Sequence, residues 1–182
     1  MTMRIYVPRD AGAVAVGADE VARALWAAAD RSGEAVEIVR TGSRGLYWLE
    51  PMVEVATAQG RVAFGPVTPA DAPSVFEAMR TDGAHPLKLG VADDIPWLKR
   101  QTRLTFARCG VVDPRSAEDY RAHDGYKGLA RALELGSEAT LSEVTASGLR
   151  GRGGAGFPNG VDRTTVAQAG AGPKYIVCHS DE

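Results

Sequence analysis

The sequence predicts an α/β fold. Short β-type runs alternate with segments of helical spacing along roughly the first 80 residues. Helix-start signals recur at Thr68, Ser116 and Thr140, each followed three residues later by a carboxylate. A glycine-rich loop then precedes a continuous apolar run over 174–178, a pattern typical of a strand buried on both faces of a parallel sheet. Strands and helices in alternation indicate the α/β class.

The first strand is predicted over residues 3–8 (MRIYVP) and the second over residues 35–39. Between them, apolar residues recur at helical spacing, with Asp19 as the expected N-cap and Gly33 as the stop. The residues expected on the buried face of this helix are Val21, Leu25 and Ala28.

A hairpin is predicted next, because residues 52–57 and 61–64 alternate apolar and polar side chains around a Gln59-Gly60 turn. The helix that Thr68 opens should bury Ala72, Val75 and Met79. The resulting order, βαβ–ββ–α, matches a thioredoxin-like domain over residues 1–80.

Residues 81–147 are predicted to form a linker followed by a helical segment. A helix is expected over 95–106, and another over 126–136 that Gly136 ends. Residues 148–182 then read as the beginning of an α/β domain: the glycine loop, a helix over 161–169 and the apolar strand. We expect this domain to be truncated, because a buried strand needs neighbours for its backbone.

Composition narrows the function classes. The net charge is −2, which gives no broad field for nucleic acid. No apolar run is long enough for a membrane span, and no secretory signal is visible. The two cysteines, Cys109 and Cys178, fit a reducing cytoplasm and are read as small core residues. No metal site and no catalytic Ser/His/Asp arrangement is predicted.

The glycine loop, 151–156 (GRGGAG), carries the strongest chemical signal. Glycines let successive backbone N–H groups approach an anion, and Arg150 and Arg152 add positive charge. A flexible linker is the alternative interpretation. Asp181 and Glu182 follow the predicted strand, where carboxylates can accept hydrogen bonds from a ligand, although the residues alone favour a solvated chain end.

Residues 147–158 (SGLRGRGGAGFP) and 174–178 (KYIVC) resemble the flavin-binding segment of the flavin subunit of respiratory complex I, the 51 kDa family. Within that family, residues 40–51 (RTGSRGLYWLEP) and 95–97 (IPW) are similar to the β subunit of soluble NAD-dependent molybdenum or tungsten formate dehydrogenase.

The resemblance implies a Rossmann-like FMN-binding domain, with Phe157 stacking on the NAD adenine. It also implies a [4Fe–4S] cluster in the complete subunit, whose ligands are not in this chain. The implied partners are a molybdenum or tungsten catalytic subunit and a [2Fe–2S] thioredoxin-like subunit. The residues that match flavin-contacting or neighbouring loop positions are Gly151, Arg152, Gly153, Gly154, Ala155, Asp181 and Glu182.

The sequence departs from the family motif at two positions and lacks the cysteines of one cluster, and both points bear on the expected function. The family motif has Lys where this chain has Asp162, and Asn where it has His179, so FMN binding should be weakened. With only two cysteines, no four-thiolate [2Fe–2S] cluster can form within the chain. Two alternatives therefore remain: a flavin subunit of complex I or an NAD-reducing hydrogenase, and a non-catalytic docking module.

Overall fold

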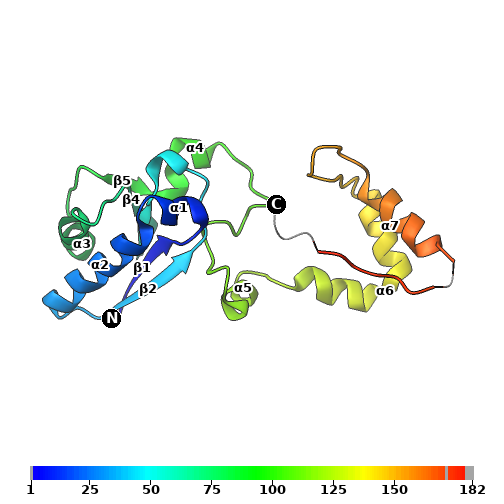
Figure 1. Ribbon diagram of the computed structural model, residues 1–182, viewed down its shortest axis with the longest axis horizontal. Helices are drawn as coiled ribbons and strands as arrows, with labels where there is room; N and C mark the ends of the chain where they lie inside the picture. The colour runs from blue at the N-terminus through cyan, green and yellow to red at the C-terminus, as the bar shows by residue number, and fades with distance from the viewer. Residues whose placement is uncertain (1, 171, 179–182) are drawn as a thin grey trace. The chain divides into compact units, whose positions relative to one another are not determined.

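The computed structural model describes residues 2–170 and 172–178. The chain divides into two compact units, Met1–Asp124 and Gly125–Glu182, which are described separately. The first unit is built around a single mixed sheet, and the second contains two packed helices and the glycine loop (Figure 1).

The sheet of the first unit has five strands in the order β2-β1-β3-β4-β5. β1 and β2 are parallel, with Ile5 opposite Ile38, and the β1–β3, β3–β4 and β4–β5 pairs are antiparallel. This arrangement confirms the predicted α/β class and the thioredoxin-like order. The strands are β1 (Met3–Pro8), β2 (Val36–Thr41), β3 (Val53–Thr57), β4 (Gly60–Phe64) and β5 (Lys88–Val91).

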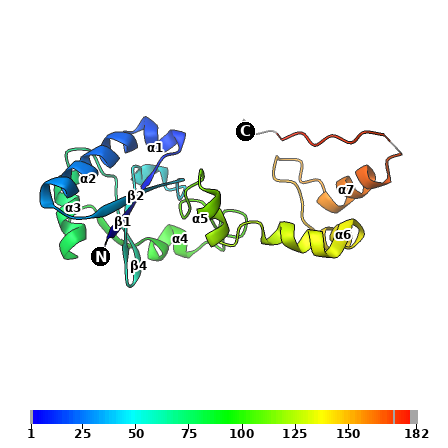
Figure 2. The same ribbon diagram turned by 90° about the horizontal axis from the view of Figure 1, so that it is seen from below.

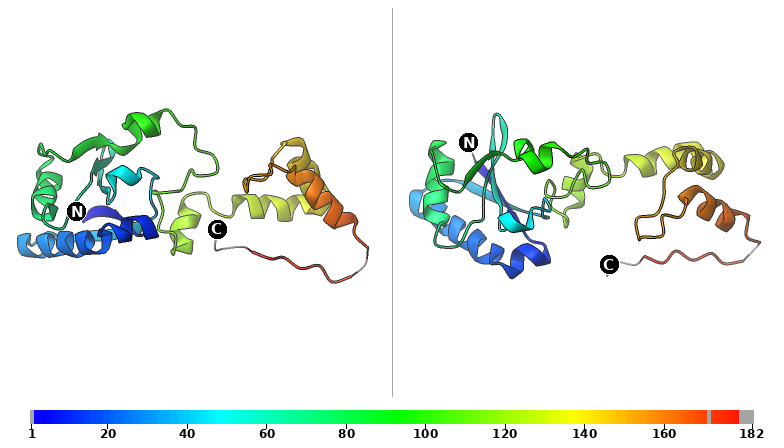
Figure 3. Two further views of the ribbon diagram at one scale, coloured as in Figure 1. Left: turned by 45° about the horizontal axis from the view of Figure 1, so that its top comes forward. Right: turned by 90° about the horizontal axis from the view of Figure 1, so that it is seen from above.

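Three helices pack on one face of the sheet: α1 (Ala11–Ala15), α2 (Ala18–Ser32) and α3 (Ala72–Thr81). Figures 2 and 3 show α2 beside α3. The two predicted helix faces are confirmed, because all six of their residues are buried in one apolar core. These residues are Val21, Leu25, Ala28, Ala72, Val75 and Met79.

The predicted cap at Asp19 is wrong, whereas the stop at Gly33 is confirmed. Helix α2 begins at Ala18 after Gly17, and Asp19 lies in its first turn, where its carboxylate pairs with Arg40 instead. Gly33 ends the helix with φ +70°, a left-handed conformation that a residue with a Cβ adopts at a cost.

The opposite face of the sheet is partly covered by short elements: η1 (Tyr47–Leu49), η2 (Ala92–Asp94) and α4 (Pro96–Lys99). They surround a second, smaller core of Leu46, Met52, Ala63, Ala92 and Leu98. The helix predicted over 95–106 is wrong beyond Lys99. The residues that follow turn instead, and Arg103 donates a hydrogen bond to the carbonyl of Arg44.

The last helix of the first unit, α5 (Ala117–Ala122), is capped by Ser116, whose hydroxyl accepts from the Asp119 amide as predicted. In the second unit, α6 (Lys127–Ala146) is interrupted at Gly136, the predicted stop, whose φ of +77° is not helical. Helix α7 (Asn159–Gln168) packs closely on α6: a Cβ on Gly160 would lie 2.5 Å from Thr145 Oγ1.

The predicted strand over 174–178 is not formed. Tyr175, Ile176 and Val177 are 82%, 100% and 74% exposed, and no strand of the described residues lies alongside to accept their backbone hydrogen bonds. An unpaired strand has nothing to hold it extended in water. The three-segment division into 1–80, 81–147 and 148–182 stays a prediction, although β5 joins the sheet beyond residue 80.

Candidate functional site

The glycine loop is closed at its base by three hydrogen bonds. The amide of Gly151 donates to the carbonyl of Phe157 (2.8 Å), and that of Asn159 to the carbonyl of Leu149 (2.9 Å). The Arg150 guanidinium spans the loop to the carbonyl of Gly156 (2.7 Å). The sequence thus forms a short closed loop that leads directly into α7, and the linker interpretation does not describe it.

Within the loop, the amide groups of residues 152–156 form no hydrogen bond to any residue that the structure describes. Gly154 and Gly156 have φ of +115° and +62°, so glycine is favoured at both. A Cβ built on Gly153, Gly154 or Gly156 would meet nothing within 4 Å. These free donors and the open space beside them fit an anionic group such as a phosphate.

The charged groups around the loop have opposite effects on the binding of an anion. Arg152 donates to the carbonyl of Arg150, so both arginines brace the loop from its exposed side. The N-terminus of α7 adds a partial positive charge. Asp162, exposed in the first turn of α7, contributes a negative charge there, which opposes an incoming anion.

Among the other predicted site residues, Gly151 and Ala155 belong to the loop, and Phe157 is 57% exposed where the loop ends. A flat ring so exposed is free to stack on a planar ligand. Asp181 and Glu182 lie outside the described residues, as does His179.

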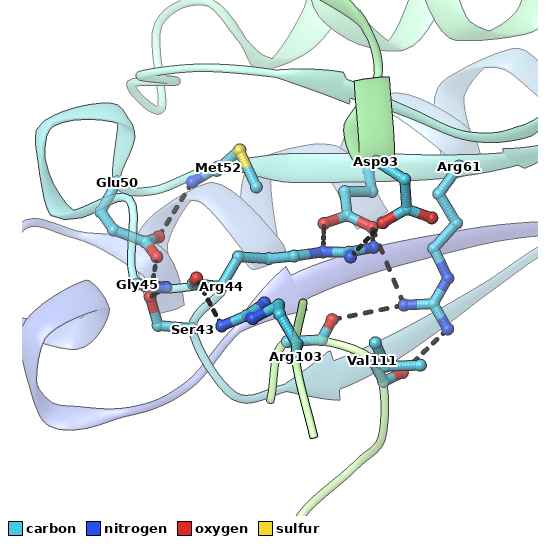
Figure 4. Close-up of polar contacts among 11 residues, drawn as sticks. Ser43, Arg44, Gly45, Glu50, Met52, Arg61, Asp93, Arg103 and Val111 are labelled. Atoms are coloured by element: carbon cyan, nitrogen blue, oxygen red, sulfur yellow. Dashed lines mark hydrogen bonds and ion pairs between the residues drawn. The ribbon is translucent and has the colours of Figure 1, made fainter. Parts of the chain in front are cut away.

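In the first unit, a buried charge network occupies the loop after β2. Arg44 makes a bidentate pair with Glu54 (2.7 and 2.9 Å), and both side chains are under 10% exposed (Figure 4). A further Arg44 nitrogen donates to Asp93 (2.8 Å). Because these partners come from β3 and η2, Arg44 joins the loop to the sheet and to the segment that follows β5.

Neighbouring groups extend the network (Figure 4). Arg61 lies over the ring of Tyr6 and donates to the carbonyl of Val111. Burial opposes the charge on Arg44, but the hydrogen bonds and charges of Glu54 and Asp93 outweigh it and raise its pKa. Burial lowers the pKa of Arg61. The network is a structural clamp made of charges that satisfy one another.

Glu50 is a second buried carboxylate in the same loop. It accepts hydrogen bonds from the Ser43 hydroxyl (2.6 Å) and the Met52 amide (3.0 Å). Burial raises the pKa of Glu50 despite these two donors.

Large aromatic side chains are exposed on this loop and on α4. Trp48 and Trp97 meet edge to face with ring centroids 5.7 Å apart, and they are 60% and 50% exposed, beside Tyr47 at 67%. The contact brings together residues 40–51 and 95–97.

The prediction that both cysteines are core residues is wrong, because Cys109 and Cys178 are exposed. Within the described ranges, no group of three or more His, Cys, Asp or Glu side chains could hold a metal ion. No helix among the described residues is long and apolar enough to cross a membrane.

Sequence reasoning missed the clamp, although the chain contains a signal for it. Glu54 stands between Val53 and Val55 in an otherwise apolar hairpin strand, on the face opposite α2 and α3. A carboxylate in that position needs a buried partner that donates hydrogen bonds or carries a positive charge, and Arg44 in a glycine-flanked loop is close by in sequence.

No family model matches the chain. Part of it is similar to the HndC protein of the NADP-reducing hydrogenase of Solidesulfovibrio fructosivorans, with 45% identity over 84 residues. That match covers 46% of this chain and 17% of HndC. The F subunit of the NADH-quinone oxidoreductase of Streptomyces coelicolor is 46% identical over 63 residues, or 35% of this chain and 14% of that protein. Its counterpart in Aquifex aeolicus is 38% identical over 90 residues, or 48% and 21%.

The chain thus spans about a fifth or less of these relatives, which are subunits of oxidoreductases. This similarity supports the resemblance to the complex I 51 kDa family. It does not support formate dehydrogenase in particular. Among solved structures, a thioredoxin-like [2Fe–2S] ferredoxin from Aquifex aeolicus aligns with a TM-score of 0.42 and 20% identity. That alignment covers 49% of this chain and 97% of the ferredoxin.

Proposed function

We propose that this chain is the front part of the diaphorase subunit of an NAD-dependent molybdenum or tungsten formate dehydrogenase, and that its glycine loop holds FMN. One observation carries the flavin proposal: five successive amides of a closed loop, residues 152–156, have no hydrogen-bond partner among the described residues. Amide donors without a partner, in a glycine loop at a helix start, suit a phosphate.

The roles of the individual residues follow from this placement. Gly153, Gly154 and Ala155 would surround the phosphate through their backbone amides, next to Gly151, whose own amide closes the loop on Phe157. The Arg152 guanidinium would turn from the Arg150 carbonyl to the ligand. Phe157 would stack on the adenine of NAD, while Asp181 and Glu182 would accept hydrogen bonds from the flavin. When bound, FMN supplies hydride exchange with NAD and electron exchange with iron–sulfur clusters.

The assignment to formate dehydrogenase is supported by the resemblance of residues 40–51 and 95–97, two segments that meet where Trp48 contacts Trp97. The partners would be the molybdenum or tungsten catalytic subunit and a [2Fe–2S] thioredoxin-like subunit, and the complete subunit would carry a [4Fe–4S] cluster. Because the chain spans only a small part of its relatives, we expect it to be inactive alone in NADH oxidation.

Two other functions remain open. A flavin subunit of complex I or of a hydrogenase is favoured by the sequence similarity to HndC and to the F subunit of NADH-quinone oxidoreductase. A docking module without catalysis is favoured by the exposed rings of Tyr47, Trp48 and Trp97, since aromatic residues are enriched at protein interfaces.

The flavin proposal is tested by titrating the isotope-labelled chain with FMN and following the amide signals by NMR. Amides of residues 151–157 should shift with FMN and not with riboflavin, which lacks the phosphate. Arg152→Ala should reduce the shifts, while Arg131→Ala on α6 should leave them unchanged. Equal shifts with riboflavin would show that the loop does not bind phosphate.

The electron donor is tested separately, by isolating the tagged chain with its partners from its native source and measuring metals. Molybdenum or tungsten with formate-dependent NAD reduction supports formate dehydrogenase. Hydrogen-dependent reduction of NAD(P) would instead identify a hydrogenase, and a complex that oxidises NADH with a quinone but uses neither formate nor hydrogen would favour complex I.

A further inference from the structure

The outer edge of β2 is an unpaired strand edge flanked by two hollows. Among the described residues, β2 pairs only with β1. The carbonyls of Ala35 and Thr41 accept hydrogen bonds from the amides of Met3 and Arg9, so the backbone groups of the odd-numbered residues of this segment face β1. Because strand residues alternate, the backbone groups of the even-numbered ones face outward. The outward-facing residues are Val36, Ile38 and Arg40.

One hollow lies between this edge and α2. Its volume is about 490 Å³, and it is lined by Arg9, Arg23, Arg40, Asp19, Ala22, Trp26 and Ile38. Three arginines against one carboxylate give it a positive charge. Arg40 pairs with Asp19 and Arg23 with Glu20, whereas the Arg9 guanidinium makes no hydrogen bond or ion pair with any described residue.

The second hollow, of about 520 Å³, lies on the opposite face between the strand edge and α5. Four consecutive residues of β2, 37–40, line it. Its charges are balanced: Arg4, Arg9, Arg40 and Arg61 face Glu37, Asp113, Glu118 and Asp119, with His123 beside them. Ile38 and Arg40, whose backbone groups point outward, line both hollows.

We propose that the β2 edge binds an extended acidic segment of a partner protein, which adds to the sheet as a sixth strand. In such an addition, main-chain hydrogen bonds supply affinity and alternate side chains enter pockets on the two faces. The positive hollow beside α2 would take carboxylate side chains at every second position. The balanced hollow beside α5 would take the uncharged polar side chains between them.

A second copy of this chain is a poorer occupant. Two β2 edges related by a twofold axis would bring the arginine-rich hollows of both copies to one interface, and like charges oppose such pairing. An acidic segment instead complements the guanidinium of Arg9 and leaves the existing ion pairs in place.

The test uses a short fluorescent peptide that alternates Glu and Thr, titrated against the full chain by anisotropy. We expect saturable binding, with a dissociation constant at least tenfold weaker for the Lys/Thr peptide. The same Glu/Thr peptide methylated on alternate backbone nitrogens should also bind at least tenfold more weakly. Arg9→Glu and Arg23→Glu should each weaken binding, whereas Arg31→Glu, on the last turn of α2 and outside both hollows, should not.

Hydrogen exchange provides the second readout. The peptide should slow exchange at the amides of Ile38 and Arg40, while Glu37 and Val39, which face β1, should change little. Binding that ignores backbone methylation would reveal a merely ionic surface and overturn the proposal. Absence of binding, or protection of Ile38 and Arg40 in a peptide-free dimer seen by ultracentrifugation, would overturn it as well.

Discussion

Replacing Arg44 by Met should destabilise the first unit severely. The side chains of Arg44 and Glu54 are 7% and 4% exposed, and the two hydrogen bonds of their bidentate ion pair satisfy both oxygens of Glu54. Without Arg44, the one ion pair that Glu54 retains among the described residues is with Arg61, at 3.8 Å. Removing one partner of a buried pair costs about 3–5 kcal/mol, because the other charge remains buried and uncompensated. Since a domain is stable by about 5–15 kcal/mol, much of its stability would be lost.

The assay is urea denaturation followed by tryptophan fluorescence, which reports on the first unit because Trp26, Trp48 and Trp97 all belong to it. Arg4→Met is the matched control: it breaks the exposed Arg4–Glu37 pair and should cost less than about 1 kcal/mol. Arg44→Met combined with Glu54→Leu should recover most of the loss, since an apolar pair replaces the charges. A cost below about 1 kcal/mol for Arg44→Met alone would refute the clamp.

Three further results are expected. Stability should rise as pH falls from 7 toward 5, because the raised pKa of Glu50 makes protonation favour the folded state. In thermal melts, Glu50→Gln should flatten this rise. An unchanged or steeper rise in the variant would contradict the role of Glu50. Below about pH 4 the trend should reverse, since hydrogen bonds from Arg40, Thr68 and Arg80 lower the pKa values of Asp19, Asp71 and Glu77. Gly160→Leu should separate α7 from α6, because a Cβ at this position would lie 2.6 Å from Thr145 Cα. Hydrogen exchange in α7 should then be faster in Gly160→Leu than in the control variant Val161→Leu. Residues 1–124 should contain no iron by elemental analysis and give no [2Fe–2S] EPR signal after reduction, and stoichiometric iron would disprove this.

Local signals predicted most of the fold. Helix faces, the hairpin turn and the stops at Gly33 and Gly136 depend on residues close in sequence, and the structure has them where expected. The predicted strand over 174–178 failed for a different reason. Its apolar run carries the pattern of a buried strand, but a strand is formed by neighbours, and the described residues offer none.

The glycine loop was predictable as a loop, and the positive φ of Gly154 and Gly156 shows why glycine is favoured at these positions. The hollows beside β2 were not predictable, because they depend on which side chains from α2, α5 and β2 meet across the sheet edge. Arg9 and Trp26 lie far apart in sequence and carry no shared local signal. Contacts of this kind appear only once the strand order is known.

We propose that the glycine loop is a flavin phosphate site and that Asp162 weakens it. Two unit charges about 10 Å apart in water interact by about 0.4 kcal/mol, so exchanging an anion for a cation near a phosphate dianion changes binding by about 1.7 kcal/mol. Tenfold in affinity corresponds to about 1.4 kcal/mol. Asp162→Lys should therefore tighten FMN binding about tenfold at low salt, and less at higher salt, where the charges are screened.

The deciding measurement is an FMN titration of this chain and its Asp162→Lys variant at two salt concentrations. Glu134→Lys, the same charge change on an exposed position of α6, is the control and should have a smaller effect. His179→Asn should help less than Asp162→Lys, because it restores a hydrogen bond and not a charge. If Asp162→Lys tightens FMN about tenfold at low salt and Glu134→Lys does not, the loop is the phosphate site. An unchanged dissociation constant for Asp162→Lys would mean that residue 162 does not face the flavin, and would contradict the assignment.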